Sequence, residues 1–429
     1  MNTNELKRKL KNNEFDKTLC YIYACGQEKA EHYSKRIEQV IEGFEETFKY
    51  TPDQMRIFSA PGRTEIGGNH TDHQHGCVLA ASLNLDVVGA VCLNGKNEVR
   101  IKSQGYPMDI ISLDDTEPKE SEKDKASALI RGVIRKISDM GYEIKGFDAY
   151  TVSSVLKGSG MSSSAAFEVL VGTIINALFC NGEIDAVQIA KIAQYAENVY
   201  FGKPCGLMDQ TASSVGAVVA IDFADKDKPD VKKVDFDFTK SGYALCIIDS
   251  GADHADLTDE YADITVEMRM VANYFGKEYL REVDKKEFFE KLKDMRSAIK
   301  NDRAILRAIH FLNDNLRAQE EAQALIKNDF DRFLDIIKSS GYSSFMYLQN
   351  IYSSANPTHQ AMSLTLALCD ELLGEKGAYR VHGGGFAGTV QAFVPNEMLD
   401  EFKLKIESVL GEGMCHVLSI RPVGGIEIK

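Results

Sequence analysis

The chain has 429 residues, of which 44% are hydrophobic and 27% are charged, close to the average usage of globular proteins. This composition argues against a disordered or fibrous protein, and the length suits two packed domains because single cores stop growing well below it. The net charge of -14, from 64 acidic and 50 basic residues, argues against a nucleic-acid partner, which requires concentrated lysine and arginine. A bound phosphate therefore needs a local pocket.

Nine cysteines are scattered along the chain without the spacing of a disulfide framework and without a C-x-x-C pair. We expect free thiols in a reducing compartment. Residues 1–15 lack the apolar stretch of a signal peptide, and no apolar run approaches the length of a membrane span. The sequence therefore predicts a cytoplasmic protein without a membrane partner, and it leaves the oligomeric state open.

The first fifty residues predict helices, because apolar residues recur there at helical spacing. These residues are Tyr33, Ile37, Val40, Ile41, Phe44 and Phe48. From residue 54 the pattern changes to short apolar runs broken by glycine and asparagine, and residues 77–93 predict buried strands. We expect a helical extension over 1–53, packed on an α/β or α+β domain that begins at residue 54.

A charged stretch at 224–233 predicts a solvated loop near a domain boundary. Beyond it, residues 242–251 predict a strand, and mostly helical sequence follows before a closing strand. The two domains are accordingly expected over 54–230 and 231–429.

A glycine- and serine-rich turn opens a long apolar helix in VLKGSGMSSSAAFEVLVGTIINALF, residues 155–179. Gly158 and Gly160 let the backbone approach an anion, and the free N–H groups of the first helical turn favour phosphate. Three serines, at 162–164, add hydroxyls for phosphate oxygens or a metal ion. The alternative is a serine-capped helix after a flexible turn. The segment is not a Walker loop, because G-x-x-x-x-G-K-[ST] occurs nowhere in the sequence.

A polar loop, APGRTEIGGNHTDHQHG, occupies residues 60–76 between apolar flanks. Arg63, Asn69, His70 and Asp72 can converge on a polyol, because sugar hydroxyls require several donors and acceptors fixed at once. A long polar turn is the plain alternative. A zinc site built from the closely spaced histidines is another, and it ranks below a sugar-facing loop.

The third segment, AENVYFGKPCGLMDQTASSVG at 196–216, carries Glu197 on a helix that runs into a glycine-containing turn before Asp209. Glu197 can hold magnesium, a hard cation that prefers one or two carboxylates plus phosphate oxygens, and Asp209 can accept a hydroxyl proton. Either acid alone is more often a cap or a surface charge. The fourth segment, YRVHGGGFAGTVQAFV at 379–394, places three glycines between strand-like runs, where they permit close approach to a ligand or form a tight β turn.

These four segments, in this order and at these separations, resemble the signature set of the GHMP kinases and, within them, of the galactokinases. The match spans Ser59 to Val394, and GMSSSAA and CGLMDQ are close copies of galactokinase motifs. The resemblance implies an α+β fold of two domains, the first like ribosomal protein S5 domain 2 and the second ferredoxin-like. It also implies an active site between the domains that binds a small-molecule sugar, ATP and Mg2+.

The resemblance assigns roles by position. Arg63 would stabilise the transferring phosphoryl group and keep the base ionised, and Asp209 would be the base or charge partner for the anomeric hydroxyl. Ser164 and Glu197 would hold Mg2+. The expected sugar-binding residues are Asn69, His70, Asp72, Gly206 and Tyr261. The expected ATP-binding residues are Gly158, Ser159, Gly160, Met161, Ser162, Ser163 and Ser164.

Asn69 departs from the family pattern, which has a glutamate at this position, expected near the sixth carbon of the sugar. A neutral amide would remove a repulsion toward a C6 carboxylate and would also suit a pentose, so we expect Asn69 to set sugar preference. The predicted reaction is the ATP-dependent phosphorylation of D-galactose, or a close relative, at the anomeric hydroxyl. Galacturonate, L-arabinose and N-acetylgalactosamine are the alternative substrates.

A sugar and ATP sensor without turnover is the alternative from another functional class. The complete phosphoryl-transfer set argues against it, because a pure sensor has no need of Arg63 and Asp209 together. A kinase for mevalonate or homoserine fits less well, since the phrases NHTD and CGLMDQ favour a sugar.

Overall fold

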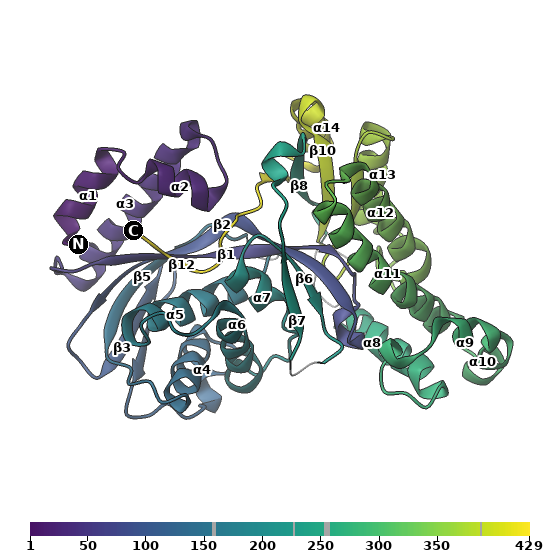
Figure 1. The fold of residues 1–429 in the computed structure, drawn as a ribbon, viewed down its shortest axis with the longest axis horizontal. Coiled ribbons are helices and arrows are strands. Elements are labelled where there is room, and N and C mark those ends of the chain that lie inside the picture. The colour runs from purple at the N-terminus through teal and green to yellow at the C-terminus, as the bar shows by residue number, and fades with distance from the viewer. Residues whose placement is uncertain (157–159, 226–227, 253–257, 387) are drawn as a thin grey trace.

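The computed structural model describes residues 1–429 except 157–159, 226–227, 253–257 and 387. Two sheets with helices around them make up the fold (Figure 1). Within the described residues the larger sheet has eight strands in the order β12-β1-β2-β5-β3-β4, with β6 paired to β2 and β7 to β6. These strands are β1 (Arg56–Gly67), β2 (Cys77–Leu93), β3 (Glu98–Ser103), β4 (Met108–Ser112), β5 (Phe147–Ser153), β6 (Val218–Asp222), β7 (Asp230–Val234) and β12 (Ile426–Ile428).

The long strands β1 and β2 form the centre of this sheet. Their sequences are largely apolar and both are buried along most of their length, as expected for strands covered on both faces. They pair in antiparallel register, which shifts between Pro61 and Arg63 and again between Glu65 and Gly67. Such bulges bend a strand and redirect its side chains. Arg63, Thr64 and Glu65 therefore lie between the two irregularities of the central strand.

Helices cover both faces of the larger sheet (Figure 1). One face carries α4 (Ala126–Asp139), α5 (Ser163–Phe179), α6 (Ala186–Tyr195) and α7 (Met208–Val215). The other carries the helices of the first fifty residues, α1 (Thr3–Lys11), α2 (Asp16–Tyr23) and α3 (Ala30–Phe48). The face of α3 that packs inward carries Tyr33, Ile37, Val40, Ile41 and Phe44.

Within the described residues the second sheet has four antiparallel strands in the order β11-β8-β10-β9. They are β8 (Tyr243–Asp249), β9 (Ala378–His382), β10 (Thr389–Pro395) and β11 (Cys415–Leu418). Its helices are α8 (Thr258–Tyr274), α9 (Lys285–Glu290), α10 (Leu292–Ile299), α11 (Asp302–Ile326), α12 (Phe330–Ser343), α13 (Ala361–Leu373) and α14 (Leu399–Leu410). Helix α11 also contacts β1 and β2 of the larger sheet. The predicted α+β class is confirmed.

The chain leaves the larger sheet after β7 and returns to it at its end. Residues 230–233, predicted as loop, belong to β7, so that part of the loop prediction is wrong. The strand lies at an edge and exposes most of its charged residues, which hides its strand character in the sequence. Strand β12 pairs with β1, and Figure 1 shows the two termini on the same side of the molecule. The expected boundary at 230 stays a prediction. In the part of the chain that the structure describes, no helix is long and apolar enough to cross a membrane.

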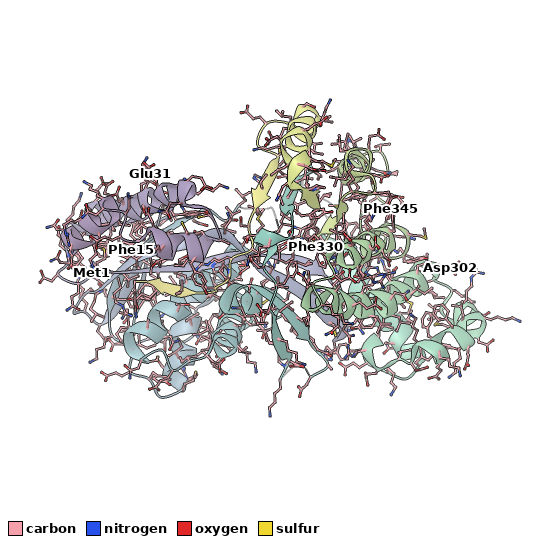
Figure 2. All side chains as sticks on the ribbon, turned by 45° about the horizontal axis from the view of Figure 1, so that its top comes forward. Met1, Phe15, Glu31, Asp302, Phe330 and Phe345 are labelled. Carbon is pink, nitrogen blue, oxygen red and sulfur yellow. The ribbon has the colours of Figure 1, made fainter. Side chains whose placement is uncertain are left out.

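An aromatic cluster joins the segment between β7 and β8 to the second sheet and its helices. Phe236 stacks on Phe330 with ring centroids 5.6 Å apart, and Phe238 packs edge-on to Phe333 at 6.1 Å. Phe333 in turn packs on Phe393 of β10 at 5.2 Å. Figure 2 shows Phe330 near the middle of the molecule, where the two halves meet. Phe333 and Phe393 are buried and the other three rings are partly buried, and aromatic pairs of this kind add to hydrophobic packing.

Candidate active site

Strand β1 and helix α7 bring Arg63 and Asp209 together. Nε and Nη2 of Arg63 donate to Oδ1 and Oδ2 of Asp209 over 2.7 and 2.6 Å. This two-pronged geometry is the one in which a guanidinium and a carboxylate bind most strongly. Helix α7 is also tied to the strand, because Oγ of Ser213 donates to the backbone oxygen of Pro61 over 2.6 Å. The two residues predicted to be catalytic thus form one rigid pair.

The charge state of Asp209 follows from this pair. Burial raises the pKa of the carboxyl, but the charge and the hydrogen bonds of Arg63 outweigh it and hold the pKa below its usual range. A hydrogen bond from Ser162 and the charge of Lys203 act in the same direction. Asp209 is therefore an ionised carboxylate at neutral pH, with its charge balanced by one guanidinium.

The turn before α5 lies directly against Arg63. Nη1 of Arg63 donates to the backbone oxygen of Gly160, and the backbone N–H of Arg63 donates to the oxygen of Met161 over 3.1 Å. The same guanidinium thus touches the proposed catalytic carboxylate and the proposed nucleotide loop. This contact connects the polar loop with the turn before α5, although the two are about a hundred residues apart in the sequence.

Helix α5 begins at Ser163, preceded by Ser162 in the left-handed conformation with φ 54°. The N–H groups of a first helical turn have no partner inside the helix, and together with the helix dipole they favour an anion. Two of the residues predicted to bind ATP, Gly158 and Ser159, lie outside the described residues.

Ser164 and Glu197 face each other across α5 and the end of α6. Oγ of Ser164 donates to Oε1 of Glu197 over 3.4 Å, and Glu197 is 3% exposed. Residues Ala196–Phe201 form a turn of π-helix, a local widening that is frequent at functional sites. Burial raises the pKa of the Glu197 carboxyl. A hydroxyl and a carboxylate are the hard oxygen donors that suit Mg2+, which also takes phosphate oxygens and water.

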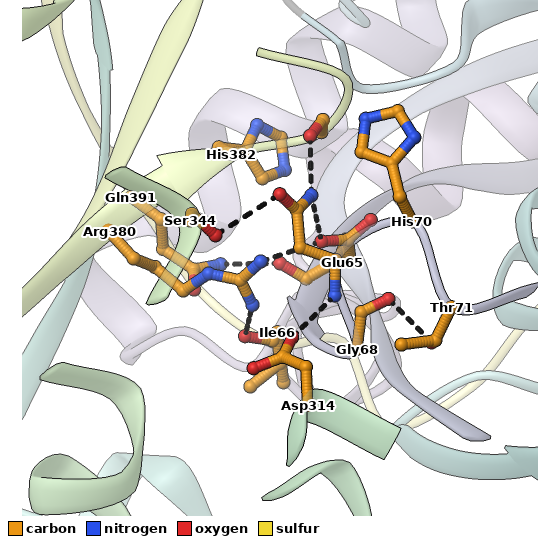
Figure 3. Close-up of polar contacts among 12 residues, drawn as sticks. Glu65, Ile66, Gly68, His70, Thr71, Asp314, Ser344, Arg380, His382 and Gln391 are labelled. Carbon is orange, nitrogen blue, oxygen red and sulfur yellow. Dashed lines mark hydrogen bonds and ion pairs between the residues drawn. The ribbon is translucent and has the colours of Figure 1, made fainter. Parts of the chain in front are cut away.

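Asn69 is buried and belongs to a network of polar contacts, of which Figure 3 labels Glu65, Ser344 and Arg380. Its Nδ2 donates to Oε1 of Glu65 over 3.1 Å and to the backbone oxygen of Gly383 over 2.7 Å. Its Oδ1 accepts from Nδ2 of Asn350 over 2.8 Å and from Oγ of Ser344 over 3.3 Å. An amide can make four such bonds, and protein groups fill all four. The sugar contact predicted for Asn69 stays a prediction, and the structure turns this amide inward.

The backbone of Asn69 is held as firmly as its side chain. Its N–H donates to Oδ2 of Asp314 over 2.9 Å, and its oxygen lies 3.0 Å from Nε2 of His310, both on α11. Glu65 below it accepts from Nη2 of Arg380 over 2.8 Å. Burial outweighs the charge of Arg380 and raises the pKa of Glu65 to about 7. The polar loop is therefore anchored to the second half of the chain.

The three-glycine turn between β9 and β10 is held by two predicted sugar-binding residues. A ring nitrogen of His70 lies 2.8 Å from the backbone oxygen of Gly384, and Oη of Tyr261 donates to the oxygen of Gly385 over 2.8 Å. A Cβ on Gly384 would lie 2.5 Å from the Tyr261 ring, so only glycine fits there. Burial, with a smaller effect from His73, lowers the pKa of His70 to about 4. His70 is therefore neutral at physiological pH.

Asp72 and Gly206 bring the polar loop against the third motif. A Cβ built on Gly206 would lie 2.9 Å from Oδ2 of Asp72, so the backbone at 206 approaches the carboxylate closely. Gly206 stands three residues before Asp209 in the chain. The predicted sugar-binding carboxylate thus lies next to the segment that carries the proposed catalytic one.

His382 received no role from the sequence, although its place in the fourth motif is unusual. Its ring nitrogens lie 3.0 Å from Oγ1 of Thr64 and 2.8 Å from Oγ1 of Thr389. A Cβ on Gly160 would lie 3.6 Å from the same ring. His382 therefore connects β9, the strand residue beside Arg63 and the turn before α5. The histidine before the glycine run was the available sequence signal. Of its two partners, Thr389 is 7 residues away, whereas Thr64 is 318 residues away and could not be read from the local sequence.

Comparison with known proteins identifies the fold and the family of this chain. The family model for the GHMP kinases N terminal domain matches residues 128–217, and the model for the galactokinase galactose-binding signature matches residues 42–93. The fold is similar to Lactococcus lactis galactokinase complexed with galactose, with a TM-score of 0.77 at 24% identity over 91% of this chain and 99% of that one. Mevalonate kinase of Methanococcus jannaschii gives a TM-score of 0.61 at 11% identity over 86% and 98%. The predicted GHMP kinase fold is confirmed.

Relatives that are similar in sequence define the family more narrowly than the fold does. Galactokinase of Clostridium tetani is 30% identical over 366 residues, which cover 84% of this chain and 89% of the relative. Galactokinase of Glaesserella parasuis is 30% identical over 364 residues, covering 84% and 90%. This chain belongs to the galactokinase family, as its motifs predict.

Proposed function

We propose that this chain transfers the terminal phosphoryl group of ATP to the anomeric hydroxyl of D-galactose or of a closely related sugar. The observation that carries the proposal is the Arg63–Asp209 pair, which lies against the backbone oxygen of Gly160 before α5. The relatives named galactokinase support the sugar and the reaction.

The proposed roles follow from charge and position. The ionised Asp209 accepts a hydrogen bond from the sugar hydroxyl and takes its proton as the new P–O bond forms. The guanidinium of Arg63 balances the negative charge of the transferring group. Phosphoryl transfer needs little beyond such positioning and charge stabilisation.

The nucleotide is expected at the start of α5, where the serines at 162–164 and the free N–H groups can bind phosphate oxygens. Ser164 and Glu197 would hold Mg2+, which neutralises charge on the phosphates when bound. The two side chains fit this ion because their oxygens already lie 3.4 Å apart and face each other.

For the sugar, we propose contacts from His70, Asp72, Gly206 and Tyr261. His70 and Tyr261 hold the three-glycine turn, and Asp72 lies against Gly206. Asn69 then acts through the loop that it holds, because protein groups fill its amide. His70 and Asp72 follow Asn69 in that loop, and they are the loop residues that contact the sugar in this proposal. Galactose, galacturonate, L-arabinose and N-acetylgalactosamine remain the candidates to compare.

The test is ADP release with ATP and Mg2+ against these four sugars and glucose, with Asp209→Asn as the blank. Asp139→Asn is a matched control, because this exposed acid pairs with Arg135 on the surface of α4. We expect one sugar to give turnover in the wild type and in the control but not in the blank. Stabilisation against heat by sugar or ATP without turnover would overturn the kinase and favour the sensor.

A further inference from the structure

One amide bridges two buried carboxyl groups beneath the Ser164–Glu197 pair. Nε2 of Gln210 donates to Oε2 of Glu197 over 2.7 Å and to Oε2 of Glu168 over 3.4 Å. Gln210 and Glu168 are 0% exposed. The three side chains come from α7, α5 and the π-helical turn Ala196–Phe201 that follows α6, so the bridge joins three elements of the site.

The bridge determines which oxygen of Glu197 faces the proposed metal position. Gln210 holds Oε2 by the shorter bond, which leaves Oε1 toward Oγ of Ser164. The last torsion of a glutamate side chain is broad, so an unheld carboxylate samples many orientations. Outer partners of this kind orient metal ligands, and removing one typically weakens metal binding by about 10- to 100-fold.

Glu168 has its own part in this arrangement. Its Oε1 is buried and, among the groups that the structure describes, has no hydrogen-bond partner. A buried oxygen left this way costs stability, so its retention calls for a reason. An amide presents an NH2 group on one side and an oxygen on the other. Because Glu168 also requires a donor, it favours the orientation of Gln210 that turns the NH2 group toward Glu197.

We propose that Gln210 and Glu168 are positioning residues that set the affinity of the Ser164–Glu197 site for the divalent cation of the bound nucleotide. Gln210 aims the Glu197 carboxylate, and Glu168 selects the orientation of the Gln210 amide. This inference rests on the proposed function, since it concerns the metal of a nucleotide complex. Neither residue needs to touch the nucleotide or the sugar.

The experiment is a Mn2+ titration of the protein with ADP, followed by electron paramagnetic resonance of the free ion. Gln210→Ala is expected to weaken Mn2+ binding by about 10- to 100-fold. The affinity for ADP without metal should not change. Glu168→Gln keeps the shape of the side chain but offers its own NH2 group to Gln210, and we expect a smaller loss in the same direction. Glu197→Gln is the positive control, and Gln319→Ala, on the exposed side of α11, is the matched control.

The outcomes separate the two proposals. Weaker Mn2+ binding in Gln210→Ala, with ADP binding and folding unchanged, supports the positioning role. If Glu197→Gln loses Mn2+ while Gln210→Ala and Glu168→Gln bind it like the wild type, the positioning role is wrong and the proposed function stands. If the wild type binds no Mn2+ with ADP, both are overturned. Should Gln210→Ala fail to fold, the near-isosteric Glu168→Gln decides the question alone.

Discussion

Both oxygens of the Asp209 carboxylate accept a hydrogen bond from the guanidinium of Arg63, at 2.7 and 2.6 Å. The third nitrogen of that guanidinium binds the oxygen of Gly160 in the turn before α5. One arginine therefore sets the charge of the proposed base and holds the proposed nucleotide loop. Two groups from different parts of the chain depend on its planar fork.

Arg63→Lys tests this dependence. A lysine keeps the positive charge but has a single ammonium, which cannot make both carboxylate bonds and the Gly160 bond in the same plane. We expect kcat to fall by about 100-fold or more, as when an electrostatic donor is removed from an active site. Steady-state kinetics measure this, with Arg135→Lys on the surface of α4 as the matched control. A rate near that of the wild type would contradict the role of the fork.

Asn69→Asp tests the buried network. The substitution replaces an NH2 group by an oxygen and sets a carboxylate against Glu65 and the backbone oxygen of Gly383. We expect a loss of about 3 kcal/mol in the free energy of unfolding, because Glu65 and the Gly383 oxygen lose a donor and face a buried negative charge instead. Urea unfolding measures it, and the exposed Asn273→Asp is the control.

The same network also bears on the expected effect of Asn69→Glu on stability and on sugar preference. The motif pattern predicts a shift of preference toward galactose, whereas the inward amide predicts a destabilised protein with an unchanged order of sugars. A stable variant with a new sugar order would show that residue 69 reads the substrate.

Gly206→Ala tests the close contact between Gly206 of the third motif and Asp72 of the polar loop. The added Cβ would lie 2.9 Å from Oδ2 of Asp72, so one of them must shift. We expect the KM for the sugar to rise by about 10-fold, consistent with overpacking that costs about 1–3 kcal/mol, while the KM for ATP stays the same. An unchanged KM for the sugar would place Asp72 outside the sugar site.

The buried His382 makes stability depend on pH. Burial, with the charge of Arg63, lowers its pKa from 6.5 to about 3. Between these two pH values, His382 therefore binds a proton in the unfolded chain but not in the folded chain. The contribution of His382 to stability is complete above pH 6.5 and is lost as the pH falls toward 3, by at most about 1.4 kcal/mol per pH unit.

Urea unfolding at several pH values between 7 and 4.5, in about half-unit steps, checks this expectation. His382→Asn should lower stability at neutral pH and flatten its fall with acid, because asparagine does not titrate. His359→Asn, at an exposed position, should keep the wild-type slope. Equal slopes in the wild type and in His382→Asn would remove this histidine from the pH dependence.

The sequence predicts the centre of the site better than its surroundings. The predicted catalytic and metal-binding residues belong to motifs whose residue types indicate their chemistry. In the structure Arg63 pairs with Asp209, and Ser164 faces Glu197. The orientation of Asn69 could not be read in the same way. Three of the four partners of its side chain lie 275 to 314 residues further along the chain, and no local pattern encodes such contacts.

Other features could not be predicted from the sequence for related physical reasons. Strand β7 exposes most of its charged residues at a sheet edge, so its sequence resembles a loop. Gln210 is next to Asp209 in the third motif, yet its bridge between Glu168 and Glu197 depends on how three helices pack. Pattern reasoning identifies residues that carry chemistry, whereas the residues that orient them become visible only with the packing.

The central claim is transfer of phosphate to the anomeric oxygen, and phosphorus NMR of a reaction with galactose, ATP and Mg2+ tests it most directly. We predict a new phosphomonoester signal coupled to the anomeric proton of the sugar, which appears with the wild type and is absent with Asp209→Asn. An equal signal in Asp209→Asn would contradict the role of the carboxylate. ATP consumption without any sugar phosphate, across the whole panel of sugars, would contradict the proposed reaction.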